Sequence, residues 1–162
     1  MKKSILLLAA IFSVVISVKS QDIADSALGI RIGDIDGFGG EISYQKKIGY
    51  SNRVELDLGF RKQDEFKDFA YKLTAIYQWV MFVEGGFNWY LGAGLGFGSG
   101  EYVKSIYHED DFFINADANI GFEYDFYAPI LISIDFRPEF GVIGKYGKDT
   151  DLDLAVSLRY QF

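Results

Sequence analysis

The sequence contains no cysteine, a single histidine and only two prolines. Without cysteine the chain cannot form a disulfide, a thiolate metal site or a lipidated N-terminal cysteine. Long apolar runs are also missing after the N-terminal segment, so no later segment is suited to cross a membrane as a helix, which takes about 20 apolar residues. If the rest of the chain spans a membrane, it must do so as a closed barrel of strands.

The N-terminal segment has the composition of a secretory signal peptide. Lys2 and Lys3 precede an apolar stretch from Ile5 to Val18, and the small residue Ser20 follows. A basic start, a short apolar run and a small residue are typical of a cleaved export signal. We therefore predict a signal peptide over residues 1–20 and one mature domain over residues 21–162.

Acidic residues outnumber basic ones by 23 to 16, a formal net charge of −7. Three of the basic residues, Lys2, Lys3 and Lys19, lie in the predicted signal peptide, so the mature part carries about −10. Nucleic acid is not an expected partner, because phosphate backbones bind basic surfaces.

From Ala27 onward, apolar and polar residues alternate with a period of two, and turn residues recur at short intervals. Such alternation indicates β-strands with one apolar face, and the short intervals leave no room for crossover helices. Ile76 is the exception to the alternation. The pattern predicts eight strands, over residues 27–33, 40–48, 53–61, 69–79, 87–98, 112–124, 129–140 and 151–162.

Charged residues fall on one face of these strands, six positive and eight negative, and only Lys46 lies clearly on the apolar face. Near-equal numbers favour mutual pairing, since an unpaired buried ion costs several kcal/mol. Lys47 and Asp153 belong to this face. The other twelve are predicted to form an interior polar network: Arg31, Glu41, Glu55, Asp57, Arg61, Lys72, Asp117, Glu123, Asp135, Arg137, Glu139 and Arg159.

Aromatic residues of the apolar face gather near the strand ends, whereas small and aliphatic residues such as Leu56, Ala93 and Leu154 occupy the middles. A lipid-facing band between two aromatic girdles has this distribution. A soluble sandwich or a lipocalin-like barrel with an aliphatic core would alternate as well. The position of the aromatic residues near the strand ends favours a different all-β fold over these two, an eight-stranded antiparallel up-and-down transmembrane β-barrel. One girdle would contain Tyr50, Tyr77, Trp79, Phe87, Trp89, Tyr124, Phe126, Tyr127, Tyr160 and Phe162, and the other Phe38, Phe60, Phe69, Phe97, Phe112 and Phe136.

The lengths of the connections predict an orientation. With the N-terminus in the periplasm, the connections 33–39, 63–68, 99–111 and 141–150 face outward, and the shorter connections 49–52, 80–86 and 125–128 face the periplasm. Long outer loops and short periplasmic turns are typical of outer-membrane barrels. The connection 80–86 fits poorly, because it is apolar and not especially short.

The last strand ends in Leu-Ala-Val-Ser-Leu-Arg-Tyr-Gln-Phe, with apolar residues at every second position up to Phe162. Together with a signal peptide and eight strands, this ending resembles the small Gram-negative outer-membrane β-barrel proteins of the OmpX and OmpA transmembrane-domain type, over residues 27–162. The resemblance implies a monomer in the cell outer membrane, in contact with outer-membrane lipids and lipopolysaccharide. It also implies that Leu158, Tyr160 and Phe162 form an assembly signal for periplasmic chaperones and the barrel-assembly machinery.

Eight strands enclose a lumen that side chains can fill, so an open water-filled channel is not expected. Four alternating glycines between residues 92 and 98 leave one inner wall bare. Either long side chains such as Arg31 fill this space from the opposite wall, or a small cavity remains; we expect a structural role with strong local curvature. Pro138, inside a predicted strand, predicts a β-bulge near the outer rim.

His108 lies near Ser105, Glu109 and Asp110 in a predicted outer loop. Such a group invites comparison with the lipid A palmitoyltransferase, also an eight-stranded barrel. Residues 21–26 are too short for the amphipathic helix of that enzyme, the lumen here is charged, and a catalytic base needs a fixed third group to orient it. An acidic loop of this kind could also hold a divalent cation loosely. We expect no catalytic residues, no cofactor and no metal site.

These features predict a non-enzymatic outer-membrane protein with a structural or surface-interaction role, such as adhesion or recognition, through its outer loops. Loop residues such as Phe66, Tyr102 and Tyr107 suit contact with an unidentified surface partner or with lipopolysaccharide headgroups. The alternative is a narrow, porin-like conduit for ions or small solutes along the lumen.

Overall fold

Eight antiparallel strands form a closed barrel. The computed structural model describes residues 23–33, 39–61, 70–101, 110–126, 128–144 and 150–162. Each strand pairs with its neighbours in sequence, and β8 pairs back to β1, so no edge of the sheet is left open. The predicted all-β, eight-stranded up-and-down fold is confirmed. The strands are β1 (Ser26–Gly33), β2 (Gly40–Lys47), β3 (Asn52–Arg61), β4 (Ala70–Glu84), β5 (Phe87–Glu101), β6 (Asp110–Asp125), β7 (Ile130–Ile143) and β8 (Thr150–Gln161).

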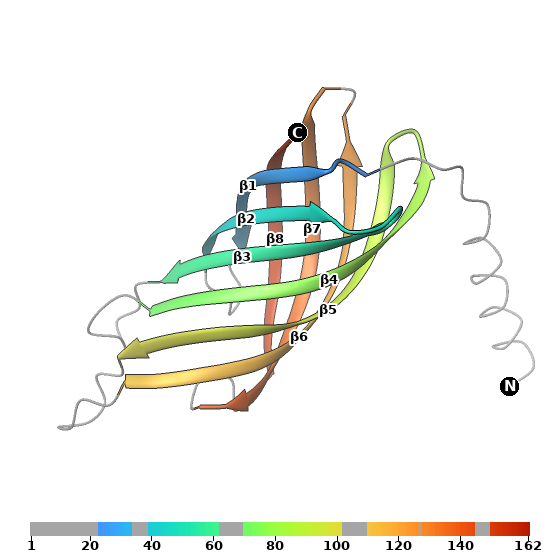
Figure 1. The fold of residues 1–162 in the computed structure, drawn as a ribbon. Helices are drawn as coiled ribbons and strands as arrows, with labels where there is room; N and C mark the ends of the chain where they lie inside the picture. Colours follow the sequence, from blue (N-terminus) through green and yellow to red (C-terminus); the bar gives the residue numbers. More distant parts are fainter. Residues whose placement is uncertain (1–22, 34–38, 62–69, 102–109, 127, 145–149) are drawn as a thin grey trace, which may run out of the picture.

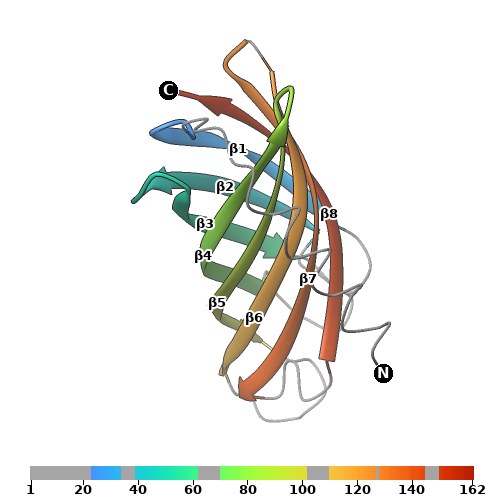
Figure 2. The same ribbon diagram turned by 90° about the vertical axis from the view of Figure 1, so that its right-hand side faces the viewer.

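The strands are steeply tilted, as closure of a small barrel requires. In Figure 1 the near strands β2 to β4 cross the far strands β7 and β8 at a large angle, and Figure 2 shows the same barrel after a quarter turn. The turns that follow β2, β4 and β6 lie at the same end as the C-terminus, towards the upper right of Figure 1. We call this end the short-turn end.

The turn between β4 and β5 is much tighter than the sequence suggested. Strand β4 continues to Glu84, and Gly85 and Gly86, with φ angles of 62° and 89°, make the reversal. Two-residue hairpin turns of this kind need positive φ at both positions, which glycine adopts without strain. The prediction of a connection over residues 80–86 is therefore wrong: the apolar residues before Gly85 extend the strand, with a register shift between Phe82 and Glu84.

Pro138 causes no bulge. The register between β6 and β7 is the same on both sides of it, with Asp117 opposite Glu139 and Ile120 opposite Phe136. Proline cannot donate a ladder hydrogen bond, and among the described strands Pro138 has its pairing partner only in β8. The shift in β7 lies further along, where Ile114 and Asn115 face residues 141–143. The predicted bulge at Pro138 is therefore misplaced by a few residues.

Adjacent strands fill the space over the inward-facing glycines of β5. A Cβ on Gly92 would lie 2.6 Å from Cγ2 of Ile76 in β4, and a Cβ on Gly98 would overlap the ring of Phe113 in β6. Ile76, the exception to the alternation, points inward and is fully buried for this reason. Side chains of neighbouring strands, rather than Arg31 from the opposite wall or a cavity, therefore occupy this space.

Replacing one of these glycines tests whether the neighbouring strand lies too close to leave room for a side chain. Gly94→Ala is expected to lower the free energy of unfolding by about 1–3 kcal/mol, the usual cost of overpacking a filled interior. The new Cβ would lie 2.8 Å from the Cα of Ile76, a backbone atom that cannot turn aside. Urea-induced unfolding of the refolded barrel, followed by tryptophan fluorescence, measures the change. Gly40→Ala is the matched control, since a Cβ there meets nothing within 4 Å; equal losses at both positions would contradict the prediction.

Candidate functional site

Buried side chains in this barrel are mostly polar, and exposed ones are mostly apolar. Ile30 and Ile32 are 50% and 58% exposed, whereas Arg31 between them is 1% exposed. A soluble barrel has the opposite arrangement, so the lipocalin-like alternative with its aliphatic core is excluded. Among the side chains that the structure describes, five cationic and eight anionic ones are buried: Arg31, Arg53, Lys72, Arg137 and Arg159, and Glu41, Glu55, Asp57, Asp117, Glu123, Asp135, Glu139 and Asp153.

Eleven of the twelve residues predicted for the interior network belong to this buried set. The side chain of the twelfth, Arg61, lies outside the described residues. Asp153 is buried with them, whereas Lys47 lies near the short-turn end, with its Nζ 3.7 Å from Oδ1 of Asp25. The alternation of apolar and polar residues therefore indicated which side chains point into the barrel.

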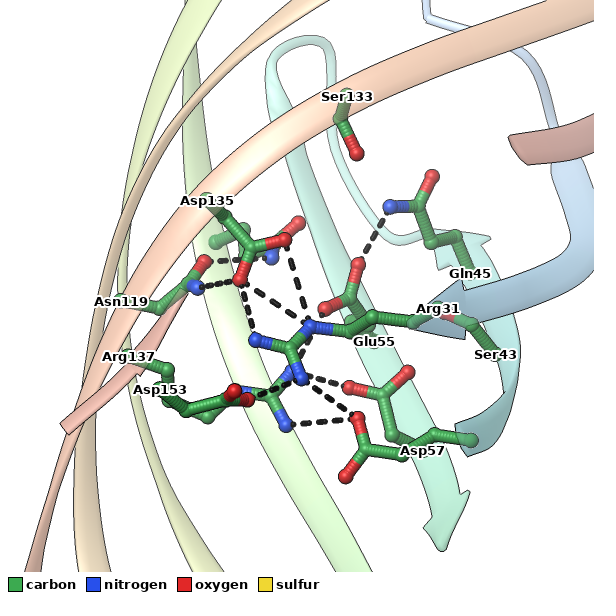
Figure 3. Close-up of polar contacts among 12 residues, drawn as sticks. Arg31, Ser43, Gln45, Glu55, Asp57, Asn119, Ser133, Asp135, Arg137 and Asp153 are labelled. Carbon is green, nitrogen blue, oxygen red and sulfur yellow. Dashed lines mark hydrogen bonds and ion pairs between the residues drawn. The ribbon is translucent and has the colours of Figure 1, made fainter. Parts of the chain in front are cut away.

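Arg31 on β1 holds three carboxylates (Figure 3). Its Nη1 lies 2.8 Å from Oε2 of Glu41 and 2.5 Å from Oδ2 of Asp153, and its Nη2 lies 2.7 Å from Oδ1 of Asp135. A guanidinium presents its N–H donors in fixed directions within one plane, so a single arginine can bind several carboxylates at once. Arg31 thereby connects β1 to β2, β7 and β8.

Arg137 on β7 reaches carboxylates of strands that do not pair with β7. Its Nη1 lies 3.3 Å from Oε2 of Glu41, and its Nη2 lies 3.3 Å from Oε1 of Glu55. The same Nη2 also donates to Asp57. Glu41 is thus shared between Arg31 and Arg137, which places two like charges around one carboxylate and links their ion pairs into a single cluster.

Arg159 on β8 adds hydroxyl partners to the same cluster. Its Nη2 lies 2.9 Å from Oε2 of Glu55, while its Nε and Nη1 donate to the hydroxyls of Ser43 and Ser133 at 2.9 and 2.8 Å. Gln45 also donates to Glu55, at 2.6 Å (Figure 3). Additional hydrogen bonds of this kind offset part of the cost of burying charges together.

Arg53 is a member of the interior that the sequence analysis missed. Its Nη2 lies 2.6 Å from Oε2 of Glu123, its Nε donates to Gln78 at 2.6 Å, and its guanidinium lies 5.0 Å from the centre of the Tyr90 ring. Arg53 has the same parity in β3 as Glu55, so the alternation itself contained the signal. Arg53 is the first residue of the predicted strand, and it precedes the first apolar residue of the alternation, Val54.

Lys72 on β4 and Glu139 on β7 form a further buried ion pair. Asn115 donates to Asp117 and, at 3.4 Å, to Glu139, so these four side chains form one polar group between β4, β6 and β7. Amides such as Asn115 separate carboxylates that would otherwise repel one another at close range.

A cluster of buried apolar side chains lies at the short-turn end, formed by Ile23, Val80, Phe82 and Tyr90, and we call it the apolar floor. The side chains of Ile23, Val80 and Tyr90 are at most 7% exposed, and Phe82 packs against them. Val80 and Phe82 continue the inward parity of Gln78 beyond the predicted end of the strand. This explains why residues 80–83 are apolar on both faces: one face meets the floor and the other belongs to the outer surface.

Exposed and half-buried aromatic rings contact one another around the short-turn end. The ring centroids of Tyr77 and Trp79 are 4.7 Å apart, those of Phe87 and Tyr124 are 4.5 Å apart, and Phe126 meets Tyr124 edge-on at 4.6 Å. All five residues belong to the girdle predicted at this end. Tyr127 of that girdle, and Phe38 and Phe69 of the other, lie outside the described residues.

Comparison with known proteins gives two solved structures of the same architecture. The N-terminal β-barrel domain of Pseudomonas aeruginosa OprF superimposes with a TM-score of 0.65, at 12% identity over 86% of this chain and 98% of that domain. Neisserial surface protein A superimposes with a TM-score of 0.62, at 16% identity over 86% of this chain and 94% of that protein. The chain has the fold of the small outer-membrane β-barrels. No protein-family model and no curated protein matched the sequence.

The predicted resemblance to small outer-membrane β-barrels is therefore confirmed at the level of fold. In the part of the chain that the structure describes, no helix is long and apolar enough to cross a membrane, and no three His, Cys, Asp or Glu side chains are arranged to hold a metal ion. The loop group of Ser105, His108 and Glu109 lies outside the described residues, as does the side chain of Asp110. The assembly signal stays a prediction; its residues Leu158, Tyr160 and Phe162 are exposed on the outer face.

Proposed function

We propose that this protein is an integral, non-enzymatic protein of the bacterial outer membrane with a structural or surface-interaction role. One observation carries the proposal: the barrel has an apolar outer surface and an interior occupied by mutually paired charges. An apolar exterior of this kind is stable in hydrocarbon, where every backbone group must be satisfied within the barrel. Arginines that bind carboxylates on several strands make the barrel a rigid scaffold rather than an open pore.

In this proposal the short-turn end faces the periplasm and the connections 34–39, 62–69, 102–109 and 145–149 face the outside. Loops on a rigid scaffold are where recognition usually resides, so these connections are the proposed contact with a surface partner or with lipopolysaccharide. Leu158, Tyr160 and Phe162 would be read by chaperones and the assembly machinery before the barrel closes, and outer-membrane lipids would cover them afterwards.

Location and orientation can be tested together on intact cells. The protein should stay with the outer-membrane fraction until detergent is added, and an epitope inserted between residues 104 and 105 should be accessible to antibody on intact cells. An epitope inserted in the turn after Gly85 should be accessible only after lysis. Release without detergent would contradict the membrane proposal, and the reverse pattern of accessibility would contradict the orientation alone.

A conduit along the lumen is the second candidate, and one feature favours it. Among the described residues, eight buried carboxylates face five buried cations, and one carboxylate oxygen each of Asp57, Asp117 and Asp153 has no hydrogen-bond partner. An acidic excess of this kind would attract cations. The apolar floor of Ile23, Val80 and Tyr90 opposes passage, because an ion would lose its hydration there without gaining a partner.

Single-channel recording separates the two candidates. The purified barrel in planar bilayers is expected to show no steady, ion-selective conductance, because paired side chains and the apolar floor fill its lumen. The matched variants are Arg31→Met and Glu55→Gln. A steady conductance in the unmodified protein that disappears in either variant would establish the conduit instead. An acyl-transfer activity that His108→Ala abolishes would show that the protein is an enzyme after all.

A further inference from the structure

One cation interrupts the apolar outer surface at the short-turn end. Lys46 on β2 is exposed and has the outward parity of Ile42 and Tyr44. Its cross-strand neighbours are Ser26 on β1 and Val54 on β3. A charged side chain on the lipid-facing side of a barrel is costly unless its head reaches the interface or finds a partner there.

Hydroxyl groups orient this ammonium. Nζ of Lys46 donates to Oγ of Ser26 at 3.1 Å, and the same Oγ lies 3.4 Å from the hydroxyl of Tyr44. Among the described residues no carboxylate pairs with Lys46. A lysine ammonium has three N–H donors, so two remain available to an acceptor outside the protein.

The surroundings of Lys46 suit a lipid better than a free anion. Ser26 exchanges backbone hydrogen bonds with Phe162 at 3.0 and 2.8 Å, which brings the end of β8 beside the hydroxyl pair. Tyr160 and Phe162 are 59% and 64% exposed, and their rings stack with centroids 6.3 Å apart. Leu28 continues this surface towards the middle of the barrel and is 48% exposed. Apolar surface thus begins immediately beside the cation.

We propose that Lys46, Ser26 and Tyr44 form a binding site for the phosphate group of a glycerophospholipid in the leaflet at the short-turn end. The ammonium would neutralise the phosphate and the tyrosine hydroxyl would donate to it, while the acyl chains lie along Tyr160, Phe162 and Leu28. This inference rests on the proposed membrane location. It adds a specific lipid contact, which membrane insertion by itself does not require.

The site can be tested by native mass spectrometry of the full-length barrel in detergent, titrated with phosphatidylglycerol. Lys46→Gln is expected to weaken retention of the first bound lipid about tenfold, the loss that corresponds to one hydrogen bond to a charged group. Lys47→Gln is the matched control: it removes the same charge one residue away, on the opposite face of β2, where Nζ is 3.7 Å from Oδ1 of Asp25. Tyr44→Phe should give a smaller loss of retention.

Two further probes identify the ligand. Diacylglycerol, which has no phosphate, should bind equally to the unmodified protein and to Lys46→Gln, and inorganic phosphate should not displace phosphatidylglycerol. Equal retention of phosphatidylglycerol in Lys46→Gln and Lys47→Gln would overturn the proposal, and displacement by inorganic phosphate would show a site for free anions instead. Detergent-dependent extraction of the variants from outer membranes is scored separately, so failure of the lipid site leaves the membrane proposal intact.

Discussion

Arg31→Met is expected to lower the free energy of unfolding by about 3–5 kcal/mol, the usual loss when one partner of a buried ion pair is removed. The variant leaves Glu41, Asp135 and Asp153 in the interior without the guanidinium that each of them binds. Methionine keeps most of the apolar stem, so the loss of packing is small. Guanidinium-induced unfolding from lipid vesicles measures the difference from the unmodified protein.

The number of carboxylates left behind should set the size of this loss. Arg159→Met removes the same charge but leaves only Glu55 without that contact, and Glu55 keeps its partners Arg137 and Gln45. It should therefore cost less than Arg31→Met. Adding Asp135→Asn to the Arg31→Met variant removes one of the carboxylates that lost its cation, and should recover part of the lost free energy of unfolding. An Arg31→Met barrel as stable as the parent would refute the view that these ion pairs hold the interior together.

Leu154→Arg is expected to destabilise the barrel in lipid bilayers by about 2–4 kcal/mol, the measured range for arginine near the bilayer midplane. Leu154 lies in the middle part of β8, faces outward and is 45% exposed. If water surrounded the barrel, the same change would be a surface substitution worth at most about 0.5 kcal/mol. The measurement is unfolding of the folded barrel from vesicles.

Thr150→Arg is the matched control for Leu154→Arg. It introduces the same side chain on the same face of the same strand, at the first residue of β8. An arginine near the interface costs about 0–1 kcal/mol, because its guanidinium reaches the headgroups. A much larger loss of unfolding free energy for Leu154→Arg than for Thr150→Arg would show that residue 154 lies deeper in a bilayer than residue 150. Equal small losses at both positions would contradict the membrane proposal.

The strands and their inward faces could be predicted because lipid and lumen impose opposite requirements on alternate residues. From Leu28 to Ile32, and again from Leu152 to Tyr160, every second residue is apolar without a break. Errors arose where a different requirement overrides the alternation. Val80 and Phe82 are apolar and inward because they form the floor, and Ile76 is apolar and inward because it fills the space over two glycines.

The partners of each charge could not be predicted from the sequence. Arg31 bridges to Asp135, and Arg137 to Glu55 and Asp57, between strands that do not pair with one another. Such contacts depend on the radius of the barrel, the stagger of its strands and the rotamers of long side chains, none of which alternation specifies. The filling of the space over Gly92 and Gly98 by adjacent strands depends on local curvature in the same way.

The ion pairs across the lumen also bear on the order of folding. Arg31 and Asp153 are 122 positions apart in the chain, and Ser43 and Arg159 are 116 apart. Contacts between such distant positions repay their loop-closure entropy only when the last strand has arrived. Before β8 pairs with β1, Arg31 lacks Asp153 and Ser43 lacks Arg159, so joining the two ends of the chain completes the polar interior at the same step that closes the sheet.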